Sequence, residues 1–424
     1  MAARKVILLS FVPITIVGLY IFLFGLNIPF LDQWEVVSLL QKKQQGLLTL
    51  SDLFAQHNEH RPFFPRLIWI AFSTFTHYNI NVQLWVNLCL TIGTFAFFVN
   101  RAARTWEMFG VRSSSYLIPL LSLLVFNLGQ RESWLQGIQT IMFLGMACVI
   151  MGLFLLSDDS SGVKFAGAIL LGVIATYSMA NGLLYWLIGI PVIWVSPSKN
   201  SRIVRSILWI ISSILCFGFF LTNWSSSGQL NFAYGFTHPF QWLVWILDFL
   251  GSPLMTLWYV AWIFGCISVA LYILIIRQLF RTKQWHPLIP YFAITLFILL
   301  TAFSISLGRM EMGLRQAVVP RYLTMSVWYW TSLLTLLPIS GMKIQYQRAL
   351  CVFFAVSLIC LTIGGGWRGY VSLYQRILPA YEAVKSGQVV SDEVLAQISS
   401  DPVVARTRLE FLCENKLSAC TTQP

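Results

Sequence analysis

The sequence predicts an all-α polytopic membrane protein. Of its 424 residues, 57% are hydrophobic, 15% are aromatic and only 10% are charged. Soluble proteins carry about 25% charged residues, so this composition indicates a chain surrounded by lipid. The 17 tryptophans suit a protein with two membrane interfaces. The formal net charge of +12 fits lysines and arginines beside cytoplasmic helix ends, and we expect no nucleic-acid partner.

Apolar runs predict about eleven transmembrane helices. A spanning helix needs about 20 mostly apolar residues, and the first run, Val6–Leu26, follows Arg4 and Lys5. A signal peptide is the alternative, but the run is long enough to span and no small-residue cleavage site follows it, so we expect a retained helix. The other candidates are Ile80–Val99, Tyr116–Leu128, Thr140–Leu156, Phe165–Met179, Leu183–Val195, Ile203–Leu221, Leu257–Ile276, Pro287–Ile305, Tyr322–Leu337 and Leu350–Gly364.

Basic loops predict the orientation. With the N-terminus inside, four of the five predicted cytoplasmic loops are basic, as the positive-inside rule requires, and Asp158–Lys164 is the exception. This topology requires that Pro62–His77 does not cross the membrane, so we expect that segment to lie in or dip into the outer interface. The basic loops are Arg101–Arg112, Lys199–Arg205, Arg277–Lys283 and Lys343–Arg348.

The topology divides the chain into a transmembrane domain, residues 1–366 with an outer loop over 27–79, and a small extracytoplasmic tail, residues 367–424. A later outer segment, Asn223–Met255, opens with the polar run NWSSSGQLN and continues as an amphipathic stretch, which predicts another interfacial helix. Two short helices are predicted in the tail, the second capped by Ser391. Cys413 and Cys420 either close a disulfide outside the cytoplasm or remain free thiols.

Two acids follow the first predicted helix in NIPFLDQWE. Asp32 and Glu35 are three apart, so a helix beginning there would place both on one face. Partial desolvation at the membrane surface would raise the pKa of Asp32 toward that of a general base. The pair could instead bind a divalent cation such as Mg²⁺ or Mn²⁺ through oxygen, or simply begin a helix whose dipole favours acids. We take Asp32 and Glu35 as candidate catalytic residues and leave the metal open.

The segment HNEHRP places four ionisable side chains within five positions: His57, Glu59, His60 and Arg61. The histidines are three apart in a predicted turn, which does not match the zinc-binding helix of metalloproteases. Pro62 suits the first turn of the helix that follows. We predict that these four side chains contact substrate.

Several arginines are predicted on the outer side, against the positive-inside bias. Three of them stand in GRMEMGLRQAVVPRY, immediately before a predicted helix. Either outer acids neutralise them in a solvated rim, or they hold a phosphate. Asn181, in SMANG, either belongs to a turn or lines a cavity. The substrate-binding candidates in these segments are Arg131, Asn181, Arg309, Arg315 and Arg321.

These features resemble the GT-C glycosyltransferases, polytopic enzymes that use polyprenyl-phosphate sugars and include the protein O-mannosyltransferases and the lipid A aminoarabinose transferase. The shared features are an acid just after the first helix and a long first outer loop with surface helices, and they cover the first hundred residues and the helix plan. The family's catalytic or metal-assisting acid would correspond to Asp32, with Glu35 as a displaced partner. HNEHRPFFPR is similar to the family's His-Pro-Pro-Leu stretch through His60 and Pro62, although the double proline is missing and Arg61 intervenes.

The resemblance implies transfer of a hexose or pentose from a polyprenyl-phosphate carrier to a glycan, lipid or protein acceptor, in glycan biosynthesis for the cell envelope. The outer arginines would hold the lipid phosphate, Asp32 would act as the base, and no cofactor beyond an open divalent cation is implied. The protein would be multi-pass in the plasma (inner) membrane, with its site on the extracytoplasmic face.

Other functions remain open on the sequence alone. A transporter or flippase of a lipid-linked or small polar substrate would place charged residues at mid-membrane depth, whereas the predicted helices hold few. A ligase or polymerase of lipid-linked glycans would use outer arginines and a lipid phosphate in a similar way. A structural membrane protein without chemistry is the fourth alternative.

Overall fold

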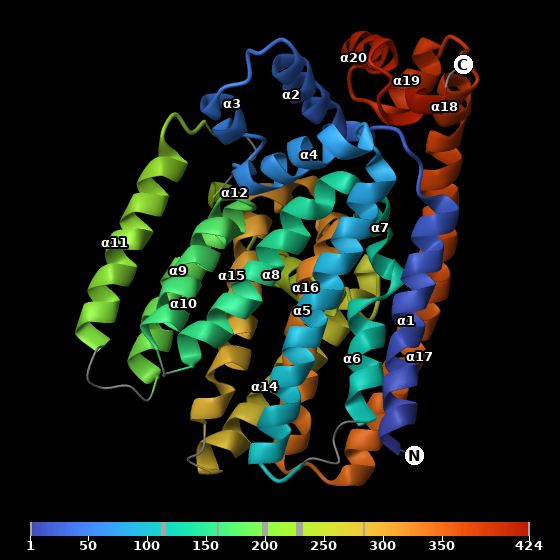
Figure 1. Cartoon of the computed structure of the whole chain (residues 1–424). Coiled ribbons are helices and arrows are strands. Elements are labelled where there is room, and N and C mark those ends of the chain that lie inside the picture. The colour runs from blue at the N-terminus through green and yellow to red at the C-terminus, as the bar shows by residue number, and fades with distance from the viewer. Residues whose placement is uncertain are drawn as a thin grey trace.

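A computed structural model describes residues 2–111, 116–158, 161–196, 202–225, 232–282 and 285–422. Within these ranges the chain is helical and contains no strand, as predicted. Figure 1 shows the longer helices running side by side as a bundle, with shorter helices lying across one end. Part of the polar run after Asn223 falls outside the described residues.

Seven helical segments of the described chain are long and apolar enough to cross a membrane, so a multi-pass membrane protein is confirmed in this coarse form. They are built on α1 (Ala2–Phe24), α5 (Ile80–Met108), α8 (Thr140–Ser157), α11 (Arg202–Leu221), α14 (Trp258–Thr282), α15 (Ile289–Arg309) and α17 (Ile344–Gly369).

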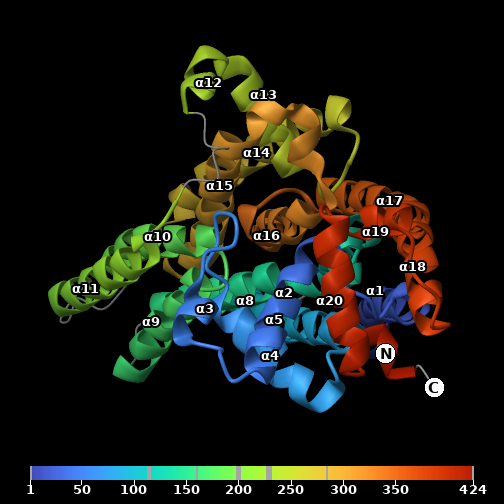
Figure 2. The same cartoon turned by 90° about the horizontal axis from the view of Figure 1, so that it is seen from above.

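The four other predicted spans also fall on helices, but these helices are shorter: α6 (Ile118–Val125), α9 (Gly162–Thr176), α10 (Leu183–Val195) and α16 (Pro320–Leu336). A count of eleven spans is therefore not confirmed. Helix α16 is central in the view from above (Figure 2), and every residue from Tyr322 to Leu336 is buried. Helix α11 lies at the periphery and exposes an apolar face that includes Ile207, Ile211 and Leu215, as expected for contact with lipid.

Three short helices of the first outer loop lie across the end of the bundle (Figure 1): α2 (Trp34–Gln44), α3 (Leu50–Phe54) and α4 (Phe63–Thr76). Helix α4 buries Pro65, Trp69 and Ser73, which recur every four residues and so lie on one face. With 14 residues, α4 is too short to span the bilayer unaided. It lies across the bundle, as expected for Pro62–His77 (Figure 1).

The C-terminal tail covers the same end of the bundle (Figure 1) and contains α18 (Gln375–Lys385), α19 (Asp392–Ile398) and α20 (Pro402–Glu414). Ser391 caps α19 as predicted, by accepting a hydrogen bond from the Val394 amide. The boundary at residue 367 falls inside continuous helix, because α17 runs through a π-helical turn into α18. Cys413 and Cys420 form a disulfide, which decides between the two alternatives.

The tail is bound to the first outer loop. The Trp34 indole donates to the Ile398 carbonyl (3.0 Å), and the Ser418 amide donates to the His77 carbonyl (2.8 Å). The Ser418 hydroxyl also donates to the Asn27 carbonyl (2.9 Å). These contacts join segments more than 300 residues apart and place α20 beside α2.

Candidate functional site

Two acids of the first outer loop, Asp32 and Glu35, meet at His57. A 3₁₀ turn, η1 (Leu31–Gln33), leads directly into α2, so Asp32 and Glu35 lie on adjoining turns. His57 Nδ1 lies 2.6 Å from Glu35 Oε2, and its Nε2 lies 3.7 Å from Asp32 Oδ2. The His57 side chain is only 7% exposed, whereas Asp32 and Glu35 are 58% and 54% exposed. The buried histidine thus contacts two carboxylates that are themselves more than half exposed.

His57 is positioned by a tight turn. The backbones of His57 and His60 pair through two hydrogen bonds of 2.8 Å, and Asn58 has the left-handed φ of 47° that asparagine tolerates well. The predicted turn is therefore present. His60 points another way, because its Nδ1 accepts a hydrogen bond from the Ala180 amide (3.0 Å).

The electrostatics of this cluster differ from the sequence-based expectation. The contact with His57 lowers the pKa of Asp32 more than partial burial raises it. Burial raises the pKa of Glu35, but the hydrogen bond and charge of His57 outweigh it, so that this pKa is also lowered. Burial lowers the pKa of His57, yet the two carboxylates outweigh burial and raise it to about 9. The expected upward shift for Asp32 is therefore wrong, because the histidine dominates over desolvation.

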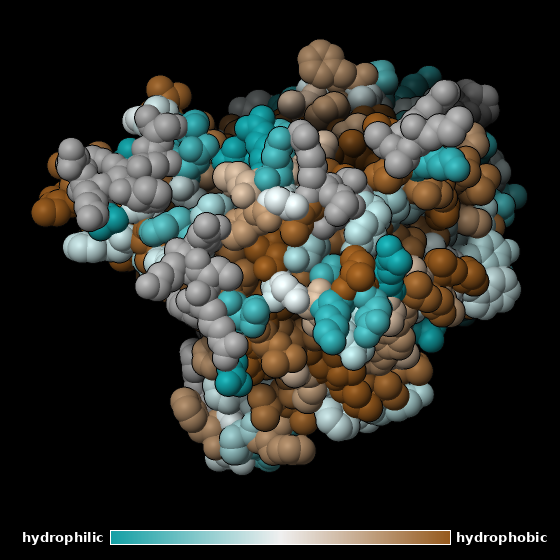
Figure 3. Space-filling model, turned by 90° about the horizontal axis from the view of Figure 1, so that it is seen from below, coloured by the Kyte–Doolittle hydropathy of each residue, from teal (hydrophilic) through white to brown (hydrophobic). Residues whose placement is uncertain are grey.

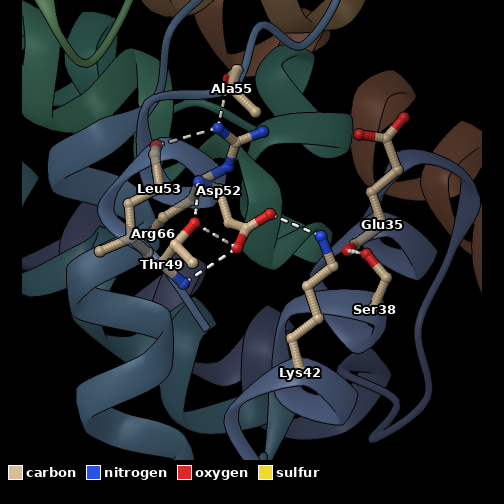
Figure 4. A network of polar contacts seen from close by, with 8 residues as sticks. All are labelled: Glu35, Ser38, Lys42, Thr49, Asp52, Leu53, Ala55 and Arg66. Atoms are coloured by element: carbon tan, nitrogen blue, oxygen red, sulfur yellow. Dashed lines mark hydrogen bonds and ion pairs between the residues drawn. The ribbon is translucent and has the colours of Figure 1, made fainter. Parts of the chain in front are cut away.

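A polar cavity of about 300 Å³ opens beside the acids. Asp32, Glu35 and His57 line it together with side chains from α2, α3 and α4. Figure 4 shows Lys42 of α2 and Asp52 of α3 facing each other, at 2.5 Å between Nζ and Oδ1. The Lys42 side chain is 48% exposed, and it lines this cavity as the partner of Asp52. The C-terminal tail also contributes, because Arg408 of α20 lines the cavity.

Arg66 of α4 also lines the cavity, beside α3, and was not among the predicted site residues. Its guanidinium is 6% exposed and donates to the carbonyls of Leu53 (3.0 Å) and Ala55 (Figure 4). Burial lowers the pKa of Arg66 to about 10, and Glu35 opposes that shift. Arg66 holds the cavity wall and adds positive charge near Glu35.

Two of the three arginines in GRMEMGLRQAVVPRY, Arg309 and Arg321, affect pKa values in the cluster. The charge of Arg321 lowers the pKa of Asp32, and both Arg309 and Arg321 help burial to lower the pKa of His60 to about 4. Burial is the largest cause of that shift, and with a pKa of about 4 His60 is neutral at pH 7. The structure brings Asp32, His57, His60, Arg309 and Arg321 into one electrostatic neighbourhood.

Arg131 and Glu132 connect to this neighbourhood through Arg321. Burial raises the pKa of Glu132, whereas Arg321 and Arg131 oppose the shift. Burial also lowers the pKa of Arg131, with Glu132 acting against it. Arg315 is exposed on η8 (Leu314–Val318), and no contact joins it to the cluster in the described part of the chain.

The remaining predicted residues have other surroundings. Arg61 is 7% exposed, and its guanidinium donates to the carbonyls of Phe54 (2.8 Å), Phe220 (2.6 Å) and Thr222. These bonds join the outer loop to the end of α11. We therefore leave Arg61 out of the proposed site. Glu59 is partly buried in the turn. Asn181 is buried in η5 (Ala180–Gly182) and follows Ala180, whose amide donates a hydrogen bond to His60.

The divalent-cation alternative gains no support. Among the described residues, no group of three or more His, Cys, Asp and Glu side chains is arranged to hold a metal ion. Asp32 and Glu35 bind the same imidazole instead.

The residues that sequence reasoning missed are Lys42, Asp52, Arg66 and Arg408. A local signal existed for Asp52, because TLSD is a capping box in which Thr49 and Asp52 bond reciprocally. No local pattern points to Arg408, which reaches the cavity through the tail. Comparison of the chain with protein-family models, with curated proteins and with solved structures found no match.

Proposed function

We propose that this protein is a membrane glycosyltransferase of the GT-C type, which moves a sugar from a polyprenyl-phosphate carrier to an acceptor in the outer cavity. The observation that carries the proposal is the arrangement of Asp32 and Glu35 around His57, beside a 300 Å³ polar cavity and within the field of Arg309 and Arg321. Such a cavity has room for a sugar unit, and its mixed acids and bases suit a polyhydroxylated ligand.

In the proposed reaction, the acceptor hydroxyl attacks the anomeric carbon of the donor sugar. The bond from that carbon to the phosphate oxygen breaks, and its electron pair leaves with the lipid phosphate. Arg321 and Arg309 stabilise the negative charge on that phosphate. Asp32 is ionised at neutral pH, as an ordinary aspartate is, and His57 lowers its pKa further. Asp32 therefore orients the hydroxyl and accepts its proton late, once bond formation has made the hydroxyl acidic.

Glu35 and His57 act as positioning residues in this scheme. His57 is hydrogen-bonded to Glu35 and lies 3.7 Å from Asp32, so its positive charge favours the position of Asp32 beside the cavity. The leaving phosphate needs no protonation, so one carboxylate base suffices for the chemistry.

The extracytoplasmic placement of the site is supported by two features. The site lies at the end of the bundle opposite to the N-terminus and the basic loops (Figure 1), which is the outer end under the positive-inside rule. The disulfide Cys413–Cys420 lies in the tail that covers this end, and disulfides persist in oxidising compartments.

The proposal is tested by incubating purified wild-type protein with a panel of polyprenyl-phosphate hexoses and pentoses and a membrane extract as acceptor. The readout is free polyprenyl phosphate measured by mass spectrometry. We expect release with one donor by the wild type, and at least a hundredfold less by Asp32→Asn at unchanged expression and thermal stability. Full activity of Asp32→Asn would remove Asp32 from its role.

The phosphate site is tested with a matched pair of arginines. Arg321→Gln should weaken donor use severalfold, whereas Arg315→Gln should not, because Arg315 is exposed and away from the cluster. Equal losses in both variants would indicate a general effect of positive charge and count against a defined phosphate site.

A transporter is the second candidate, because one acid is buried within the helices. Asp248 on α13 (Pro239–Gly251) is 0% exposed, and no cation forms an ion pair with it among the described residues. Helix α13 packs against α14 so closely that a side chain at Gly251 would collide with the Ala261 backbone. Uptake of a polar solute into proteoliposomes that is lost in Asp248→Asn, with no donor cleavage, would favour transport over transfer.

A further inference from the structure

The end of the bundle opposite to the outer cavity carries a second polar cavity, of about 270 Å³. It is formed by the C-terminal part of α5, the end of α8 and η6 (His286–Leu288), and its basic members are Arg101, Arg104 and His286. Figure 3 views this end of the molecule, where hydrophilic patches are surrounded by apolar surface.

The positive charge of this cavity is only partly neutralised. Arg101 contacts Asp158 (3.1 Å), and Lys164 shares the same carboxylate (3.0 Å). Arg101 is also held over the rings of Phe97 (5.9 Å) and Phe154 (5.5 Å). Arg104 is exposed and has no ion-pair partner among the described residues. Asp158 thus contacts two cations, and Arg104 adds a further positive charge to the lining of the cavity.

An apolar groove of about 410 Å³ lies next to the cavity, between α10, α14 and α15. Along α15 the groove runs from Ile289 to Leu299. This length corresponds to a rise of about 15 Å, which is about half the hydrocarbon thickness of a bilayer. The cavity and the groove approach each other at η6. There the Trp285 ring of the groove stacks on the His286 ring of the cavity, with 4.4 Å between the ring centroids.

We propose that this place binds an anionic phospholipid of the inner leaflet, with its phosphate in the cavity beside Arg104 and one acyl chain in the groove. The positive charge of the cavity matches the phosphate of such a lipid, and the apolar groove matches its acyl chain. The junction at Trp285 and His286 matches its glycerol region. Basic pockets between transmembrane helices on the cytoplasmic side are suited to anionic headgroups. This site does not depend on the proposed glycosyl transfer, because it lies at the other end of the bundle.

The test uses full-length purified protein titrated with phosphatidylglycerol or phosphatidylcholine and observed by native mass spectrometry. We expect phosphatidylglycerol to bind preferentially and Arg104→Gln to lower its bound fraction about fivefold. The matched control is Arg348→Gln, an exposed arginine of α17 that does not line the cavity. Leu296→Trp, in a groove position that is 41% exposed, should also lower binding by filling the groove.

Three outcomes would overturn the site. Equal binding of both lipids by the wild type would exclude headgroup selection. Equal losses in Arg104→Gln and Arg348→Gln would indicate diffuse attraction to basic loops. Thermal stabilisation by soluble glycerol 3-phosphate that equals the effect of phosphatidylglycerol, and that Leu296→Trp leaves unchanged, would assign the cavity to a free phosphate.

Discussion

Replacing His57 by glutamine removes the cation that Asp32 and Glu35 share. The two carboxylates raise the pKa of His57 from 6.5 to about 9 in the folded protein. Since one pKa unit corresponds to about 1.4 kcal/mol, the protonated imidazole stabilises the folded state by about 3 kcal/mol. Because the folded pKa is the higher one, this stabilisation is complete below pH 6.5 and is lost as the pH rises through 9.

The assay is thermal unfolding of the protein in lipid nanodiscs between about pH 6 and pH 9.5. The wild type should lose on the order of 5 °C in Tm across this window, and His57→Gln should lose much less. His238→Gln serves as the control, because His238 is exposed and its ring contacts Tyr234 and Thr237 rather than a carboxylate among the described residues. The pKa values of Asp32 and Glu35 are lowered in the folded protein, so these two acids affect stability at low pH. The stability that their ionised forms contribute is lost as the pH falls into the acid range. Equal pH slopes in the wild type and His57→Gln would refute the shared-cation arrangement.

Further predictions concern the loop and the tail. Arg61→Met should destabilise the protein by about 3 kcal/mol, seen as a lower Tm, since it leaves buried carbonyls without a donor; an unchanged Tm would contradict this. Replacing Cys413 and Cys420 by serine should lower tail stability by about 2 kcal/mol, measured as faster amide exchange in α20, and unaltered exchange would contradict it. Arg408→Gln should raise the acceptor KM severalfold, whereas Arg406→Gln should not, because Arg406 pairs with Asp392 (2.5 Å) outside the cavity; equal KM changes would refute a role for Arg408.

The bundle was largely predictable from local composition. Every predicted apolar run falls on a helix, because apolar residues in a membrane must satisfy their backbone within the helix. The lengths were less predictable: the run Tyr116–Leu128 is helical in α6 only over Ile118–Val125. The orientation of α4 across the bundle followed from counting basic loops rather than from hydrophobicity.

The site was predictable in its members but not in its contacts. Asp32 and Glu35 could be paired from their spacing, but His57 is 22 residues from Glu35, and no pattern indicates their 2.6 Å contact. The separate contact between His57 and Asp32 also reversed the expected pKa shift of Asp32.

Long-range contacts explain the other differences. Arg61 was grouped with the site because it stands beside His60, yet its partners Phe220 and Thr222 come from the end of α11. Arg408 enters the cavity because Trp34 and Ser418 bind the tail to the outer loop. Contacts of this kind depend on the packing of whole segments, which a residue pattern does not encode.

The central claim is that the outer cavity takes a polyprenyl-phosphate sugar. Its most direct test is mass-spectrometric analysis of the lipids that co-purify with the protein from its native membranes. We predict a polyprenyl-phosphate sugar bound to wild-type protein, retained or enriched in Asp32→Asn, and depleted in Arg321→Gln. Absence of any polyprenyl phosphate from all three preparations, or equal amounts in Arg321→Gln and the wild type, would contradict the proposed donor site.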